Sequence, residues 1–127
     1  MERKDILVID DNRCIISAIS RLFKGMVAGV KSVSEAEELV SVLDPRVIVA
    51  DVQLEGENGI TEIPRIKTFA PMAKIIVYTG NVNVFDSKRA RDLGAYAYLG
   101  KESVCHIRRA ISLALFAASA ANSLSLA

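Results

Sequence analysis

The sequence predicts an α/β fold in which helices cover both faces of a parallel β-sheet. Short apolar runs alternate with longer amphipathic segments along most of the chain. Most of these runs are rich in β-branched residues and lack the polar–apolar alternation of a strand with one wet face, which indicates strands buried on both sides. The length of 127 residues suits one domain, because two domains would leave neither with a proper core.

Five strands are expected from apolar runs of about strand length. The second of them is the weakest. The runs are Ile6–Ile9, Val27–Val33, Val47–Ala50, Ile75–Tyr78 and Ala95–Leu99.

Amphipathic segments between these runs predict five helices. Residues 13–24 carry isoleucine and leucine at helical spacing, and Gly25 supplies a stop. Residues 84–93 form another such segment, ended by Gly94, and a last helix is expected to start near Ser103. Five strands alternating with five helices imply a doubly wound sheet.

Capping signals mark the other two helices. Ser34 and Glu37 form a capping box before an apolar stretch that Pro45 closes. Residues 61–69 repeat the helical pattern, with Thr61 as the expected N-cap.

Composition limits the function classes. The 16 basic and 15 acidic residues nearly cancel, so net charge gives no reason to expect binding to nucleic acid or to an anionic membrane. Two cysteines are too few for a disulfide framework and fit a reducing compartment. No apolar run reaches the length of a membrane span. We therefore expect a cytoplasmic protein that acts at neither DNA nor a membrane.

Polar side chains follow four of the expected strands. Asp10 and Asp11 follow the first, Asp51 follows the third, Thr79 ends the fourth and Lys101 follows the fifth. Ligands of open parallel sheets bind outside the carboxyl ends of the strands. Three carboxylates, one hydroxyl and one ammonium are therefore expected at a single edge.

This combination of groups suits a hard cation and a phosphate. Clustered carboxylates repel one another unless a cation is present, and Mg²⁺ prefers oxygen ligands. A carboxylate can also attack phosphorus and form an aspartyl phosphate. Phosphoryl transfer asks for little beyond positioning and charge compensation, which a metal ion and a lysine can provide.

These motifs resemble the receiver domain of two-component signalling over residues 5–116. The resemblance implies a flavodoxin-like (βα)5 sandwich with strand order 2-1-3-4-5. The motifs are Asp10-Asp11-Asn12 after Ile-Leu-Val-Ile, Asp51 after Val-Ile-Val-Ala with Gly59 eight residues on, Thr79-Gly80 after Val-Tyr, and Gly94 to Lys101.

The resemblance also assigns the metal site. Asp51 matches the phosphoacceptor, and Asp10 and Asp11 match the acidic pair that holds Mg²⁺. The backbone carbonyl of Gln53 matches a further metal ligand. No other cofactor is implied.

The same comparison implies a switch. Thr79 matches the hydroxyl that moves to meet the phosphoryl group, Lys101 the lysine that pairs with it, and Tyr98 an aromatic that turns inward. The domain would receive its phosphoryl group from a sensor histidine kinase or a histidine phosphotransfer protein and control a partner or output domain. Such a switch is no enzyme beyond catalysing its own phosphorylation and dephosphorylation.

The chain departs from the family pattern at two positions. Glu102 stands where a proline after a cis bond is usual, and a cis bond before a non-proline residue costs roughly 2.5–4 kcal/mol, so a trans bond is expected. Glu55 replaces a proline in the loop after Asp51, which puts the usual shape of that loop in doubt.

Other functions stay open at this point. The aspartates could be turn or N-cap residues, and the domain could be a degenerate receiver that never carries phosphate. A phosphatase of the haloacid dehalogenase type would need an acid two residues after Asp10, where Asn12 stands.

The C-terminal part of the chain suggests an interaction. Residues 1–116 are taken as the receiver domain, and the Ala/Ser-rich segment 117–127 as a continuation of the last helix, a tail or the start of a linker. Apolar residues of the last helix cover more than one face, which suggests burial against a second copy or against another domain, and we expect a homodimer through this helix.

Overall fold

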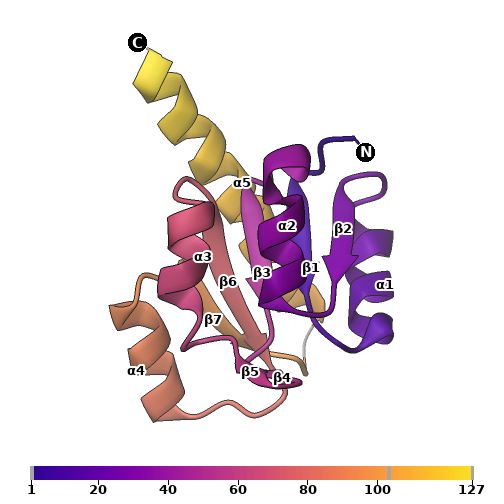
Figure 1. Ribbon diagram of the computed structural model, residues 1–127, viewed down its shortest axis with the longest axis vertical. Helices are drawn as coiled ribbons and strands as arrows, with labels where there is room; N and C mark the ends of the chain where they lie inside the picture. Colours follow the sequence, from indigo (N-terminus) through magenta and orange to yellow (C-terminus); the bar gives the residue numbers. More distant parts are fainter. Residues whose placement is uncertain (1, 103, 127) are drawn as a thin grey trace.

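The computed structural model describes residues 2–102 and 104–126, and of residues 121–126 it describes the backbone alone. Five parallel strands form one sheet in the order β2-β1-β3-β6-β7 (Figure 1). The strands are β1 (Ile6–Ile9), β2 (Val27–Val30), β3 (Val47–Ala50), β6 (Lys74–Thr79) and β7 (Ala97–Gly100). Without the two strands of a separate hairpin, this is the order 2-1-3-4-5, so the expected topology is confirmed.

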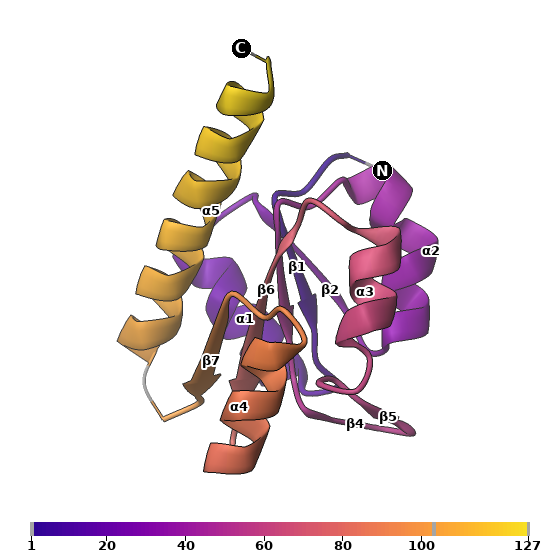
Figure 2. The same ribbon diagram turned by 90° about the vertical axis from the view of Figure 1, so that its left-hand side faces the viewer.

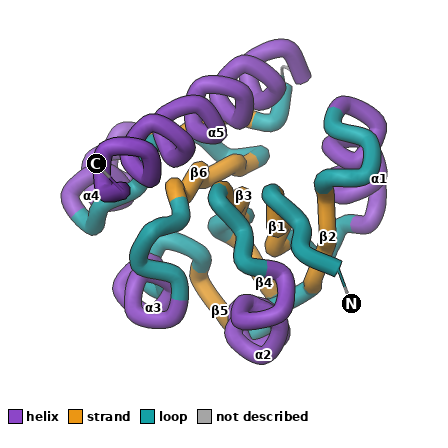
Figure 3. The backbone as a smooth tube through the Cα atoms, turned by 90° about the horizontal axis from the view of Figure 1, so that it is seen from above, coloured by secondary structure: helices purple, strands orange, loops and turns teal. Residues whose placement is uncertain are grey.

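Helices cover both faces of this sheet (Figure 3). One face carries α1 (Arg13–Leu22) and α5 (Val104–Leu126). The other carries α2 (Val33–Leu43), α3 (Ile63–Phe69) and α4 (Val84–Asp92). The doubly wound arrangement follows because right-handed crossovers place successive helices on opposite faces where the strand order reverses.

Inner strands such as β1 and β3 explain why the apolar runs are unbroken. Leu7 and Ile9 pack toward α2 and α3, whereas Ile6 and Val8 pack toward α1 and α5, and all four are at most 1% exposed. Burial of such a side chain contributes roughly 1.5–3 kcal/mol. Both faces of these strands are therefore core, and a polar residue on either face would be costly.

The second helix begins earlier than predicted. Its N-cap is Ser32, whose hydroxyl accepts a hydrogen bond from the Glu35 amide at 3.1 Å, so the capping box at Ser34 and Glu37 was wrong by two residues. The earlier start places Val33 and Ala36 in the core, and their burial decides between two similar capping patterns. At α3 the shift is in the other direction: Glu62, one residue after the expected Thr61, occupies the N-cap position.

The last helix is the longest element and runs past the end of the sheet (Figures 1 and 2). Its buried stripe reaches Ala118, and Arg46, directly before β3, donates to the Ser119 hydroxyl. The segment proposed as a tail, 117–127, is therefore helical through Leu126, while Ser103 and Ala127 lie outside the described residues. None of the helices among the described residues has the length and apolar character needed to span a bilayer.

A small hairpin after β3 was not predicted. It consists of β4 (Gln53–Leu54) and β5 (Glu57–Asn58), paired antiparallel around a turn that contains Glu55 and Gly56. Gly56 has a positive φ of 74°, which L side chains rarely adopt. The hairpin lies at the edge where the parallel strands end (Figure 1).

The peptide bond between Lys101 and Glu102 is trans, as expected.

Candidate functional site

The predicted carboxylates meet at the carboxyl edge of the sheet. Asp10 directly follows β1 and Asp51 directly follows β3, and the last residues of these strands, Ile9 and Ala50, pair in register. Asp10, Asp11 and Asp51 each offer an oxygen, and these oxygens all lie within 4.8 Å of one another. Asp10 and Asp51 are buried, whereas Asp11 is exposed, so the cluster opens to solvent on one side.

Lys101, which directly follows β7, completes this cluster. Its ammonium lies 2.8 Å from Asp10 Oδ2 and 3.0 Å from Asp51 Oδ2. Its backbone N–H donates to the carbonyl of Thr79 at 2.8 Å, which ties the chain after β7 to the end of β6. The structure therefore brings Lys101 to two of the three carboxylates, although fifty residues separate it from Asp51 in sequence.

Burial and charge oppose one another at this cluster. Burial raises the pKa of Asp51, and the hydrogen bond and charge of Lys101 offset this only in part, while the Asp10 carboxylate adds repulsion. Burial by itself would lower the pKa of Lys101, but the hydrogen bonds and charges of Asp10 and Asp51 outweigh it and raise the pKa. The lysine is therefore charged at neutral pH and compensates part of the local negative charge.

Turn formation explains part of the acidic motif after β1. Asp10 Oδ1 accepts a hydrogen bond from the Asn12 amide at 2.8 Å, and the Asn12 side chain in turn caps α1 by accepting from the Cys14 amide at 2.9 Å. The interpretation of Asp10 as a turn residue thus holds for its Oδ1, while its Oδ2 accepts a hydrogen bond from Lys101. Asn12, not Asp11, caps the helix, so capping does not account for Asp11.

Gly59 closes the loop behind Asp51. Its N–H donates to the Val52 carbonyl at 2.9 Å, and a Cβ at this position would lie 2.0 Å from the backbone oxygen of Asp51. Only glycine permits this approach without a shift of the backbone. Gln53 lies within the closed loop, where its N–H donates to Asp51 Oδ1 at 3.4 Å.

The two predicted switch residues both hold the loop between β6 and α4. The buried Thr79 hydroxyl accepts from the Asn81 amide at 3.1 Å. The hydroxyl of Tyr98 accepts from the Asn83 amide at 3.2 Å. Asn83 is the N-cap of α4 and was missed, although the spacing of Asn83 and Asp86 is a recognisable cap signal.

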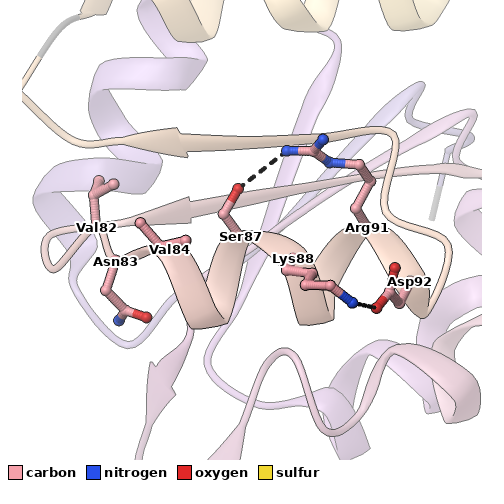
Figure 4. A pocket seen from close by; sticks show the side chains of 7 residues that line it. All are labelled: Val82, Asn83, Val84, Ser87, Lys88, Arg91 and Asp92. Atoms are coloured by element: carbon pink, nitrogen blue, oxygen red, sulfur yellow. Dashed lines mark hydrogen bonds and ion pairs between the residues drawn. The ribbon is translucent and has the colours of Figure 1, made fainter.

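A surface cavity of about 560 Å³ lies along α4 (Figure 4). Arg91 donates to the Ser87 hydroxyl at 3.4 Å and Lys88 pairs with Asp92 at 2.9 Å within it. Neither the three carboxylates nor Lys101 lines this cavity. Position at the strand ends, and not cavity size, therefore identifies the candidate site.

The donor set fits a hard divalent cation. Asp10, Asp11 and Asp51 provide only oxygen ligands, and one of them faces solvent, as suits an ion that keeps bound water. No histidine or cysteine takes part in this cluster, which disfavours zinc.

A parallel α/β sheet with clustered carboxylates and a lysine at its carboxyl edge defines a class of phosphate- and cation-handling domains. Residues 6–111 match the response regulator receiver domain family, and the chain belongs to this family. This membership excludes the haloacid dehalogenase alternative.

Individual relatives agree with this placement. The chain is 31% identical over 120 residues to the DNA-binding transcriptional regulator NtrC of Azospirillum brasilense, covering 88% of this chain and 25% of that protein. The beryllofluoride-activated NtrC4 receiver domain dimer superposes with a TM-score of 0.82 at 32% identity, covering 93% of this chain and 99% of that one.

A third relative carries a phosphorylated aspartic acid. A response regulator from Burkholderia pseudomallei was solved with a phosphorylated aspartic acid, a calcium ion and citrate. It is 28% identical to this chain with a TM-score of 0.76, and the match covers 96% of this chain and 72% of that protein's chain. The chain spans about a quarter of the length of the curated NtrC relatives. It is thus a response regulator receiver domain, and one of its relatives carries a phosphorylated aspartic acid.

Proposed function

We propose that this domain accepts a phosphoryl group on Asp51, in the presence of Mg²⁺, from a sensor histidine kinase or a histidine phosphotransfer protein. The observation that carries the proposal is the contact of Lys101 with both Asp10 and Asp51, beside the third carboxylate of Asp11. The Asp51 carboxylate would attack phosphorus while the bond from phosphorus to the donor breaks, leaving an aspartyl phosphate.

Asp10, Asp11, Asp51 and the backbone carbonyl of Gln53 would hold Mg²⁺, which supplies charge compensation for the transferred group. Lys101 already lies beside Asp51 and would follow the new negative charge onto the phosphoryl oxygens. Thus the lysine that stabilises the unmodified cluster would pair with the phosphate after transfer. Autodephosphorylation by water would reset the domain, and no external metabolite would be turned over.

The loop before α4 is where we expect phosphorylation to be read out. The Thr79 hydroxyl holds the Asn81 amide, so movement of this hydroxyl toward a phosphoryl oxygen would release one end of the loop. The Tyr98 hydroxyl holds the Asn83 amide, at the start of the helix. The hydroxyls of Thr79 and Tyr98 thus both accept hydrogen bonds from this loop, and a local change of charge at the site could rearrange it.

The partner surface proposed for the domain includes the last helix. Leu113 and Phe116 are 51% and 75% exposed on α5, next to the buried stripe. The NtrC4 receiver relative forms a dimer, and we infer that this chain associates with a second copy through α5. The near-neutral charge gives no reason to expect that this domain itself contacts nucleic acid or an anionic membrane, and the two cysteines suit the cytoplasmic location that we propose.

Phosphorylation can be tested directly. Incubation with Mg²⁺ and acetyl phosphate should add a single phosphoryl mass that hydroxylamine removes. Asp51→Asn should abolish the addition because an amide is not a nucleophile, whereas Asp92→Asn, at an exposed position on α4, should be labelled like the wild type.

The outcomes separate the two candidate roles that the family allows. Equal labelling of wild type and Asp51→Asn would refute the acceptor assignment. No labelling of wild type at any donor concentration would indicate a degenerate receiver that acts as a binding module.

A further inference from the structure

The hairpin β4–β5 is too small to hold its own conformation. It has two residues in each strand, and an isolated two-stranded hairpin is at best marginally stable in water. It nevertheless begins at Gln53, two residues after the proposed phosphoacceptor Asp51. Contacts with the rest of the domain must therefore fix the backbone of this segment.

Glu57 makes the closest polar contact between the hairpin and a helix. Its Oε1 accepts a hydrogen bond from the Val33 N–H at 2.8 Å, and its side chain is only 15% exposed. Val33 is the first residue of α2, where backbone N–H groups lack partners within the helix. A carboxylate is especially favourable at this end of a helix because the macrodipole is positive there.

The second oxygen of Glu57 faces another helix. Oε2 lies 3.7 Å from the guanidinium of Arg65 on α3, and the same guanidinium bonds to Glu37 of α2 at 2.7 Å. Glu57 therefore joins the hairpin to α2 directly and to α3 through Arg65. Gly59 closes the other end of the loop against Asp51, so Gln53 lies between two fixed points.

We propose that Glu57 is a positioning residue of the cation site, which holds the Gln53 backbone in place by pinning the β4–β5 hairpin to α2 and α3. This rests on the proposed function, in which the Gln53 carbonyl is a Mg²⁺ ligand. Glu57 touches neither the cation nor the phosphoryl group, and it acts through the hairpin backbone. Residues that orient metal ligands in this way typically affect affinity without being ligands themselves.

Mg²⁺ affinity of the unphosphorylated protein, measured by isothermal titration calorimetry, tests this role. Glu57→Ala should weaken Mg²⁺ binding by about tenfold. Glu57→Gln should bind Mg²⁺ more strongly than Glu57→Ala but measurably more weakly than wild type, because its amide oxygen can still accept from the Val33 amide while the charge at the helix end and beside Arg65 is lost. Glu37→Ala removes another carboxylate from Arg65 without touching the hairpin, and should bind Mg²⁺ like the wild type.

Hydrogen exchange without metal provides a second readout. The amides of Val33 and Gly59 should exchange faster in Glu57→Ala than in wild type, and Glu37→Ala should leave the Gly59 amide unchanged. Faster exchange combined with unchanged Mg²⁺ affinity would reduce Glu57 to a purely structural contact and overturn the proposal.

The failure of this inference can be told apart from failure of the proposed function. If the wild type shows no saturable Mg²⁺ binding, both are overturned. If the wild type binds and folded Glu57→Ala binds equally well, only the positioning role is overturned. If Glu57→Ala does not fold, Glu57→Gln decides, and wild-type affinity in that variant would overturn the role.

Discussion

At the level of single residues, Asp51 lies between opposing influences. Burial raises its pKa above the ordinary value of 3.8, and Lys101 offsets this effect only in part. The site therefore holds an unfavourable negative charge while no metal is bound. A bound cation can relieve this repulsion, so binding of Mg²⁺ at the site should also stabilise the fold around it.

This balance predicts the effect of Asp51→Asn on stability. The pKa of Asp51 is higher in the folded protein than in the unfolded chain. Its contribution to the free energy of unfolding is therefore fully present at a pH below the unfolded-state pKa, and it is lost as the pH rises through the folded-state pKa. Without metal, Asp51→Asn should thus be more stable than wild type at neutral pH, and the two should converge in acid. Urea unfolding between about pH 3 and pH 8 with a chelator measures this.

Asp92→Asn serves as the control in the same series. Its carboxylate pairs with Lys88 at the surface, and exposed pairs contribute less than about 1 kcal/mol. A metal-free Asp51→Asn protein that is less stable than wild type at neutral pH would contradict the predicted sign.

A second residue-scale prediction concerns Gly59. Gly59→Ala would place a Cβ 2.0 Å from the Asp51 carbonyl oxygen, and relief of that clash requires the backbone behind the phosphoacceptor to shift. We expect a loss of about 1–3 kcal/mol, as for other overpacked sites, measured by urea unfolding. Gly80→Ala meets open space and should change stability by less than about 0.5 kcal/mol. Equal effects of the two substitutions would refute the steric argument.

At the level of elements, the loop before α4 depends on side chains from two strands. Thr79 of β6 holds Asn81, and Tyr98 of β7 holds Asn83, the N-cap of the helix. Ala90 is the only α4 residue that is buried, so packing contributes little to the placement of this helix. Its position therefore depends on the loop contacts, as the proposed switch requires.

Tyr98→Phe tests that dependence. The change removes the hydroxyl that accepts from the Asn83 amide, so this amide should exchange faster and stability should fall by about 0.5–1.5 kcal/mol. Tyr96→Phe, at a more exposed tyrosine of the same segment, should leave the Asn83 amide unaffected. Nuclear magnetic resonance hydrogen exchange measures both. An unchanged Asn83 amide in Tyr98→Phe would show that the hydroxyl does not hold the loop.

At the level of the whole molecule, α5 extends the domain beyond its sheet (Figure 2). One stripe of this helix, with Ile107, Ile111, Ala114 and Ala118, packs into the core. Phe116 lies outside this stripe and is 75% exposed. A large aromatic side chain in that position is costly in solvent and favourable at an interface.

Self-association through α5 is therefore expected, and it should strengthen in the activated state. Phe116→Glu should shift the protein toward monomer in sedimentation experiments with and without beryllofluoride and Mg²⁺. Phe85→Glu, at a phenylalanine that is 87% exposed on α4, controls for the loss of a surface aromatic. A wild-type monomer under every condition at high concentration would exclude the dimer.

The local features that the sequence missed share one physical cause. Ser32 and Ser34 offer similar caps, and only the burial of Val33 and Ala36 selects the first. Glu57 looks like a solvated loop carboxylate in the sequence, and its role appears only once α2 and α3 lie beside it. Neither choice is visible in local patterns, because each depends on segments distant along the chain.

The sequence pattern by itself determined the layers and the convergence of Asp10, Asp11, Asp51 and Lys101, because buried parallel strands with polar residues at their carboxyl ends meet at one edge of a sheet. The strand order followed from the resemblance to receiver domains. Tertiary structure decided which oxygens Lys101 contacts, how Gly59 closes the acceptor loop, and where the β4–β5 hairpin is anchored. Apolar periodicity records burial along one element. Contacts between polar side chains depend on distances between elements, and these exist only in the folded chain.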